Sequence, residues 1–394
     1  MRKLTPAEER RLKVFTENSI PVTLIEPTTT GLKKSIMDAT GPVRNYLKER
    51  GCHDFTCQGQ GTQNKVLVKS ILYSGFSTKN TRTSLYRPST KKGDPRIWVY
   101  GLTAYADPND ILALVYFEGT MHAINISRLP LEKLVNSPVT NPLKELVSEI
   151  SSKENRVPNE LLGLIRNISG RGFIPSNLNA DTAVGRLLET LLGIDINSSK
   201  QPDYKGIELK SFRSNKGNRK NLFAQVPNWE LSKFKSSGEI LDAFGYWRDE
   251  DFKLYCTVST LVENSQGLFL KTDLEKEKLI ESSSNHLVND FAVWELSKLH
   301  ERLLEKHRET FWVSAESKVI NGVEHFQYSA VEHTRKPIVS QFDILLDQGK
   351  ITLDHLIKRD RRGKTREKGP LFKIKPNALN LLFPPSKKYD LLQE

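Results

Sequence analysis

Residues 185–213 read GRLLETLLGIDINSSKQPDYKGIELKSFR, and this stretch predicts a short helix, a loop and two strands joined by a tight turn. The apolar residues of the helix recur at i, i+3, i+4 and i+7, which is the spacing of one helical face: Val184, Leu187, Leu188 and Leu191. Asp181 or Thr182 can cap the start of this helix, and Gly193 can close it in a left-handed conformation.

The turn at residues 204–206 is entered by Asp203 and left by an alternating strand. Successive side chains of a strand point to opposite faces, so Glu208 and Lys210 share one face about 6–7 Å apart. The turn can fold Asp203 back beside Glu208. Two carboxylates that meet repel each other unless a cation lies between them, and Mg²⁺ prefers oxygen ligands.

The pattern Asp203-x4-Glu208-x-Lys210 therefore predicts a divalent metal site beside an ammonium group. Such a site suits hydrolysis of a phosphodiester, because its charge must be neutralised and a water made nucleophilic near neutral pH. Glu189 lies about 140° around the helix from the apolar stripe, so it is a candidate third acid. The alternative is a solvated surface strand, since acid-x-Lys spacings are common in a highly charged chain; Glu316-x-Lys318 is another.

The motif resembles the catalytic core of PD-(D/E)XK nucleases, and more closely the MvaI/BcnI family of restriction endonucleases and the mismatch-repair nickase MutH. GRLLETLLG followed by D-x-x-G-I-E-L-K resembles the MutH core, and WVSAESKVINGVEHFQYS and LFKI resemble MvaI. The resemblance spans residues 163–383. It implies that Asp203 and Glu208 bind Mg²⁺ and that Lys210 positions or polarises the attacking water. It also implies that Glu189 either binds a second metal ion or orients Lys210.

The composition of the chain indicates what kind of molecule it binds. A net charge of +12 over 394 residues favours a polyanion such as DNA. Three cysteines form neither a disulfide framework nor a zinc pattern. The N-terminus lacks the apolar segment of a signal peptide, and the longest apolar run, residues 111–117, is too short to cross a bilayer. We expect a cytoplasmic protein without a membrane segment.

The pattern of elements predicts an α/β (α+β) chain of two domains. Residues 1–150 would form a smaller α+β or β-barrel-like domain that adds DNA contacts as an effector or second recognition module. The resemblance implies that residues 158–394 form a PD-(D/E)XK, MutH-like mixed sheet with flanking helices that carries catalysis and recognition. Prolines between residues 130 and 158 predict a break between the two. A long amphipathic helix is expected over residues 285–306, with Trp294 in the core.

Three basic segments are candidate DNA contacts. The densest, residues 358–368, lies between strand-like segments and either enters the major groove or forms a disordered loop with non-specific affinity. Its candidate residues are Arg359, Arg361, Arg362, Lys364, Arg366 and Lys368. The MvaI family uses a histidine-rich stretch in this region, and residues 366–368 here read REK, so the family's target sequence is not carried over.

The second segment follows Lys210 and is expected to be a solvated loop beside the catalytic strand, with Arg213, Lys216, Arg219 and Lys220. The third is the turn at residues 86–98, with Arg87, Lys91, Lys92 and Arg96. This turn either clamps DNA or is a structural turn that Tyr86 and Trp98 anchor to the domain core.

The sequence thus predicts a sequence-specific, Mg²⁺-dependent endonuclease of duplex DNA, a type II restriction enzyme of the MvaI/BcnI family. The alternatives are a MutH-like nickase and a non-catalytic DNA-binding protein with a decayed core. The presence of Asp203, Glu208 and Lys210 argues against a decayed core. A restriction enzyme also implies a cognate DNA methyltransferase in the same genome; no stable protein partner is expected, and a monomer fits.

Overall fold

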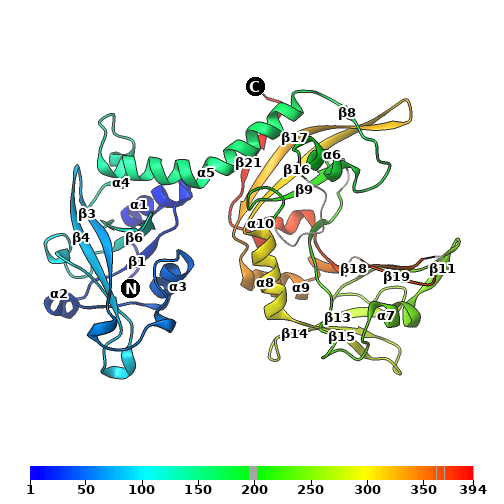
Figure 1. Cartoon of the computed structure of the whole chain (residues 1–394), viewed down its shortest axis with the longest axis horizontal. Helices are drawn as coiled ribbons and strands as arrows, with labels where there is room; N and C mark the ends of the chain where they lie inside the picture. Colours follow the sequence, from blue (N-terminus) through cyan, green and yellow to red (C-terminus); the bar gives the residue numbers. More distant parts are fainter. Residues whose placement is uncertain (195–201, 216, 361, 368, 394) are drawn as a thin grey trace. The chain divides into compact units, whose positions relative to one another are not determined.

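The computed structural model describes residues 1–394 except 195–201, 216, 361, 368 and 394, and leaves out the side chain of Lys91. Its contacts divide the chain into two compact units, Met1–Val157 and Pro158–Glu394 (Figure 1). Both units combine helices with curved sheets, so the predicted mixed α/β class is confirmed. No helix within the described residues is long and apolar enough to cross a membrane.

The N-terminal unit is built on a seven-stranded sheet. Its strands follow the order β1 (Thr23–Ile25), β6 (Leu112–Phe117), β7 (Thr120–Asn125), β3 (Val66–Ser74), β4 (Ser77–Tyr86), β5 (Arg96–Val99) and β2 (Met37–Asp38). One hydrophobic cluster packs this sheet against α3 (Gly41–Glu49). A second cluster joins the sheet to α1 (Pro6–Glu17), α4 (Leu131–Val135) and the start of α5 (Pro142–Ser169). The sheet is therefore covered on two sides.

The C-terminal unit contains three sheets. The first has the order β21 (Lys387–Asp390), β17 (Val323–Arg335), β16 (Glu309–Ile320) and β9 (Glu208–Arg213), with β8 (Ile174–Pro175) beside β17. The second has the order β10 (Lys220–Ala224), β20 (Leu371–Ile374), β18 (Ile351–Arg359), β12 (Asp251–Val258) and β11 (Tyr246–Arg248), with β19 (Thr365–Arg366) beside β18. The third is β13 (Leu268–Asp273), β14 (Lys278–Ser283) and β15 (Asp290–Glu295).

One hydrophobic core joins the second and third sheets to helices of this unit. The helices in this core are α7 (Ser237–Phe244), α8 (Leu296–His307), α9 (Val339–Asp347) and α10 (Leu379–Leu382), whereas α6 (Ala183–Leu191) contacts β9. Strand β9 is the edge of the first sheet and runs parallel to β16, whereas β16 and β17 form a long antiparallel hairpin. This places β9 beside α6 (Figure 1).

The long helix predicted over residues 285–306 is wrong in its first half, because residues 290–295 form strand β15 before α8 begins at Leu296. The spacing of Phe291, Trp294 and Leu299 fits a helix. However, β15 pairs with β14, and this pairing decides the local structure. Trp294 is buried in the core as predicted.

The chain divides into its two units within the predicted boundary region, although α5 runs without interruption through Pro158. A proline inside a helix removes a backbone donor and usually costs about 3 kcal/mol. Packing at both ends of the helix offsets this cost. Leu143 and Ile150 are buried in the N-terminal unit, and Leu161 and Ile165 are buried in the second half. The division between the two units falls at Pro158 itself.

Candidate active site

Helix α6 forms where its apolar spacing predicts, from Ala183 to Leu191, with Val184 and Leu188 buried. Gly193 follows it with φ +70° and donates to Thr190 O, so the predicted left-handed ending is confirmed. The predicted side-chain cap is wrong. Thr182 occupies the N-cap position without a capping hydrogen bond, and Asp181 precedes it. The loop at residues 195–201 lies outside the described part of the chain.

The predicted tight turn is confirmed. Tyr204 and Ile207 exchange two backbone hydrogen bonds of 2.9 and 2.8 Å, which enclose a two-residue loop. Lys205 and Gly206 in the loop have φ of +43° and +92°, as a hairpin turn of the primed type requires. Beyond the turn, β9 begins at Glu208 and carries the acidic and basic side chains of the motif.

Glu208 and Lys210 contact each other across one face of β9, as their spacing predicts: Lys210 Nζ donates to Glu208 Oε1. The carboxylate of Glu208 is only 1% exposed. A second ammonium reaches it from α8, with Lys306 Nζ at 3.1 Å from Glu208 Oε2. Burial opposes ionisation of Glu208, but the charges of Lys210 and Lys306 outweigh it and hold its pKa below the usual value.

Asp203 is fixed beside this pair by its backbone, because Leu209 N–H donates to Asp203 Oδ2 at 2.8 Å. Burial raises the pKa of Asp203, and the nearby charge of Glu208 raises it further. The pKa of Glu189 is likewise raised by burial and by the charge of Asp203, while Lys210 opposes this rise. The structure thus places the predicted residues Glu189, Asp203, Glu208 and Lys210 close enough for their charges to act on one another.

The carboxylate oxygens of Asp203 and Glu208 are of the type that binds a divalent cation such as Mg²⁺. A cation between Asp203 and Glu208 would relieve the repulsion that raises the pKa of Asp203. Among the described residues, no three acidic, histidine or cysteine side chains already form a metal-binding cluster. Mg²⁺ commonly keeps several waters and is held by one or two carboxylates together with substrate phosphate.

Only the middle of the segment after Lys210 is a solvated loop as the sequence predicts, with residues 214, 215, 217 and 218 exposed, whereas its ends lie in β9 and β10. Arg213 is only 9% exposed; its guanidinium pairs with Glu324 at 2.6 and 2.7 Å and donates to two carbonyl oxygens before α6. Arg219 forms a two-point pair with Asp354 at 2.7 and 3.1 Å. These contacts hold the ends of the segment against the sheets. Lys216 lies outside the described residues.

Lys220 is also largely buried, and its ammonium lies 4.4 Å from the ring centre of Phe212 and 3.5 Å from Glu332. Burial lowers its pKa, and Glu332 opposes this shift. The predicted DNA contacts of Arg213, Arg219 and Lys220 remain predictions, but each of these side chains already has an intramolecular partner.

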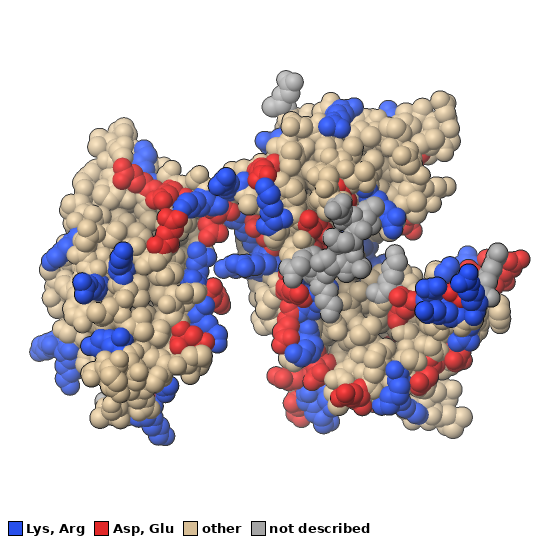
Figure 2. Space-filling model, in the orientation of Figure 1, with Lys and Arg blue, Asp and Glu red and all other residues tan. Residues whose placement is uncertain are grey.

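The basic segment at residues 358–368 forms a hairpin between β18 and β19. Asp360 organises its turn: its carboxylate accepts from the backbone of Arg362 and Lys364 and from the side chain of Arg366. Figure 2 shows lysine and arginine atoms gathered, beside some acidic atoms, at the end of the C-terminal unit where Figure 1 places β19 and β11. Arg361 and Lys368 lie outside the described residues, and Arg359 pairs with Asp242 at 2.6 Å.

Two lysines near these sites were missed by the sequence reasoning. Lys306 has no motif of its own and lies far along the chain from Glu208. Lys253 of β12 stands opposite Lys358 of β18, which in turn stands opposite Arg366 of β19. The pairing of strands brings these residues together, and no local pattern in the sequence marks it.

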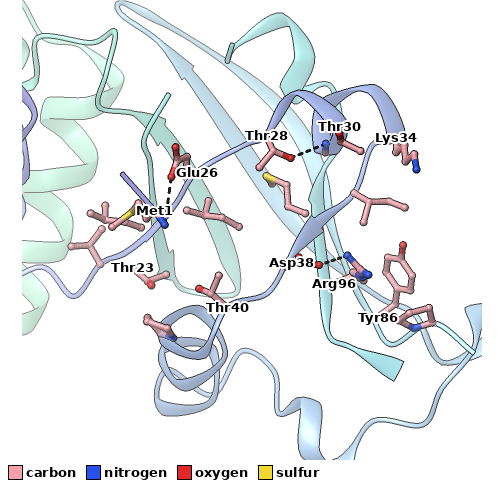
Figure 3. Close-up of a pocket in the computed structure, with 18 of the residues that line it drawn as sticks. Met1, Thr23, Glu26, Thr28, Thr30, Lys34, Asp38, Thr40, Tyr86 and Arg96 are labelled. Atoms are coloured by element: carbon pink, nitrogen blue, oxygen red, sulfur yellow. Dashed lines mark hydrogen bonds and ion pairs between the residues drawn. The ribbon is translucent and has the colours of Figure 1, made fainter. Parts of the chain in front are cut away.

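The N-terminal unit contains a cavity of about 970 Å³ (Figure 3). It lies between residues 22–42 and the basic turn, and its lining combines many apolar side chains with hydroxyl, carboxylate and basic groups. Arg96 pairs with Asp38 at its wall, and the N-terminal ammonium lies 3.6 Å from Glu26. The basic turn is structurally anchored, because Trp98 is buried and Arg87 donates to two backbone carbonyl oxygens. Lys92 is exposed.

Comparison with known proteins gives two kinds of match. The model of the MvaI/BcnI restriction endonuclease family matches residues 162–383. A solved complex of the restriction endonuclease MvaI with its cognate DNA substrate aligns with a TM-score of 0.53 at 20% identity, over 59% of this chain and 98% of that chain. A structure of MvaI without DNA gives a TM-score of 0.36 at 21% identity, over 59% and 97%. No curated protein matches the chain. The first alignment shows a shared fold.

Proposed function

Because the chain belongs to the MvaI/BcnI restriction endonuclease family, we propose that it cuts duplex DNA at a specific sequence in a Mg²⁺-dependent reaction, as a type II restriction enzyme. The observation that carries this proposal is the group formed by Asp203, Glu208 and Lys210, which lies within the matched residues and beside Glu189. The MvaI complex with cognate DNA supports duplex DNA as the substrate.

Asp203 and Glu208 would hold the ion, and the backbone of Leu209 keeps the carboxylate of Asp203 in position. When bound, Mg²⁺ supplies charge neutralisation and a water of lowered pKa. Lys210 keeps its ammonium at Glu208, where it is placed to orient the attacking water or to contact the scissile phosphate. Glu189 adds a partly buried carboxyl group that attracts the ammonium of Lys210 and so limits its movement.

DNA binding is assigned to the hairpin of β18 and β19. Arg362, Lys364 and Arg366 lie on it and are exposed. The turn is ordered by Asp360, so these side chains project from a defined backbone rather than from a flexible tail. A two-stranded ribbon fits the major groove, where an arginine can pair with guanine O6 and N7. Residues on the same ribbon that do not reach bases would contact phosphates.

The N-terminal unit is proposed to add DNA contacts as an effector or second recognition module. Its exposed Lys92 and the charged groups in the otherwise largely apolar lining of the cavity between residues 22–42 and the basic turn support this role. Lys34 and Arg96 supply donors there, while Glu26 and Asp38 supply acceptors. Deleting residues 1–157 would weaken DNA binding or alter its response to a second DNA site if the proposal holds.

The experiment that tests the proposed function is digestion of DNA of known sequence with Mg²⁺, followed by sequencing of the ends. A type II enzyme yields double-strand ends at one short sequence. Accumulation of open circular plasmid, even with excess enzyme, would instead indicate a nickase that cuts one strand. Ends scattered over the sequence would contradict sequence specificity.

A further inference from the structure

The carboxylate of Glu208 is held from two sides by ammonium groups that come from different parts of the chain. Lys210 on β9 contacts Oε1, and Lys306 at the end of α8 lies 3.1 Å from Oε2. Lys306 is only 12% exposed, and Glu208 is 1% exposed. The charge of Lys306 also acts on Asp203, whose pKa it lowers against the effects of burial and of Glu208. The charge of this second lysine therefore stabilises the ionised form of both carboxylates in the proposed metal site.

The backbone at Lys306 is fixed by its neighbour His307. This imidazole is buried: its Nε2–H donates to Leu222 O at 2.8 Å, its Nδ1 hydrogen-bonds with Thr310 Oγ1 at 2.9 Å, and its ring stacks on Trp312. The end of α8 is thus attached to β10 and β16. A cation at the C-terminal end of a helix is also favoured by the helix dipole. These contacts of His307 therefore hold the backbone of Lys306 in place beside Glu208.

The charges of the site explain why a second ammonium matters. Glu189, Asp203 and Glu208 carry three negative charges when ionised, and Lys210 and Lys306 carry two positive charges. One divalent ion and one phosphodiester would bring the sum to zero. Without Lys306 the same assembly would keep one negative charge, which opposes the build-up of negative charge during attack on the phosphate. A second cation would then be needed to bring the net charge of the site to zero.

Resting on the proposed nuclease function, we propose that Lys306 takes the place of a second metal ion in this active site. It is a positioning residue that holds Oε2 of Glu208 and supplies the positive charge there, so the site works with one divalent ion. Lys306 and a second ion compete for the same carboxylate oxygen. Removing the ammonium should therefore strengthen metal binding while it slows cleavage.

A purely structural role of Lys306 predicts no gain in metal affinity when the ammonium is removed. A buried ion pair that only stabilises the fold can often be replaced by an apolar side chain of similar volume with little effect. Its loss would leave metal affinity unchanged or, if the site were disturbed, lower. Lys210 still pairs with Glu208 in the absence of Lys306, so the carboxylate is not left without a partner.

The test counts Mn²⁺ ions bound to the free full-length protein from the electron paramagnetic resonance signal of the unbound ion. Lys306→Met should bind a second ion, or bind the first at least about tenfold more tightly, because one positive charge near the ion has been removed. Lys306→Gln keeps a hydrogen-bond donor without the charge and should behave in the same way. Lys306→Arg keeps the charge and should bind as the wild type does.

Lys298→Met on the same helix is the matched control, since it removes an exposed lysine that pairs with Glu301. It should change neither metal binding nor cleavage. Cleavage by Lys306→Met should fall at low Mg²⁺ and recover in part as Mg²⁺ rises, because a second ion then supplies the missing charge.

Two further outcomes separate this inference from the proposed function. If Asp203→Ala binds as much Mn²⁺ as the wild type with the same affinity, the site holds no metal and both proposals fail. If binding depends on Asp203 but a folded Lys306→Met or Lys306→Gln protein binds no more tightly than the wild type, the role of Lys306 is wrong and the proposed function stands.

Discussion

Lys253 of β12 lies directly opposite Lys358 of β18, and Lys358 lies opposite Arg366 of β19. Side chains opposite each other on neighbouring strands point to the same face, and like charges in such pairs are destabilising. Asp251 lies 3.6 Å from Lys253 and Asp360 pairs with Arg366, but Lys358 has no ion-pair partner within the described residues. An anion such as a DNA phosphate beside this row would relieve the repulsion between its charges.

We expect the row to contact the phosphate backbone. Lys253→Ala and Lys358→Ala should each weaken binding to all duplexes to a similar extent. Each should reduce the slope of log affinity against log salt by about one, because one fewer counterion is released. Fluorescence anisotropy at several salt concentrations measures this, with Lys298→Ala as the control. An unchanged salt slope in both variants would remove the row from the DNA interface.

Base reading is expected from at least one of Arg361, Arg362 and Arg366. Loss of an arginine that pairs with guanine should weaken binding to the target sequence by roughly 1–3 kcal/mol and affect random DNA far less. The measurement is the ratio of target to random affinity for each alanine variant. If all three variants keep the wild-type ratio, recognition lies elsewhere, and residues 87–96 would be examined next.

Arg213 is expected to stabilise the fold, not to bind DNA as its main role. Its guanidinium joins Glu324 to the carbonyl oxygens of Ala180 and Asp181, and so connects β9, β17 and the start of α6. Breaking a buried pair costs about 3–5 kcal/mol, and the partial exposure of Glu324 places the loss at or below the lower end. Urea unfolding of Arg213→Ala measures it, with Arg362→Ala as an exposed control. Equal stability of the two variants would show that the pair contributes little.

His122 of β7 should make stability depend on pH. Burial lowers its pKa to about 4, below the usual value near 6.5, and Tyr73 Oη lies 2.9 Å from its Nδ1. The unfolded chain therefore takes up a proton at a higher pH than the folded protein does. The stability that the neutral imidazole contributes is present above about pH 6.5 and is lost as pH falls towards 4.

The loss attributable to His122 should approach about 3 kcal/mol at the acid end of this range. Urea unfolding between pH 7 and 4 measures it in the wild type and in His122→Gln, which cannot titrate. The difference in the free energy of unfolding between the two proteins should shift with pH by this amount. Parallel curves for the two proteins would mean that His122 does not contribute to the acid sensitivity.

The parts of the site that the sequence predicted are those set by local signals. The apolar spacing of α6 and the turn at Lys205-Gly206 depend on neighbouring residues, so the positions of Glu189, Asp203 and Glu208 followed from them. The parts that were wrong or missed depend on distant partners. Arg213 was expected in a solvated loop because Glu324, its partner, lies on β17. Lys306 was missed because only packing of α8 brings it to Glu208.

The same reason explains the errors in secondary structure. Residues 290–295 carry helical spacing, and only their pairing with β14 makes them a strand. Pro158 normally signals the end of a helix, but the buried residues on both sides of it keep α5 continuous. In both cases tertiary contacts overrode a local preference of a few kcal/mol or less.

The most direct test of the central claim compares cleavage and DNA binding by Asp203→Ala. The substitution removes a proposed metal ligand and no phosphate contact, so it should abolish cleavage in Mg²⁺ by more than about a thousandfold, or at least about 4 kcal/mol. Binding of the target duplex in Ca²⁺ should stay within a few-fold of the wild type. Cleavage by Asp203→Ala at the wild-type rate would contradict the assignment of the active site.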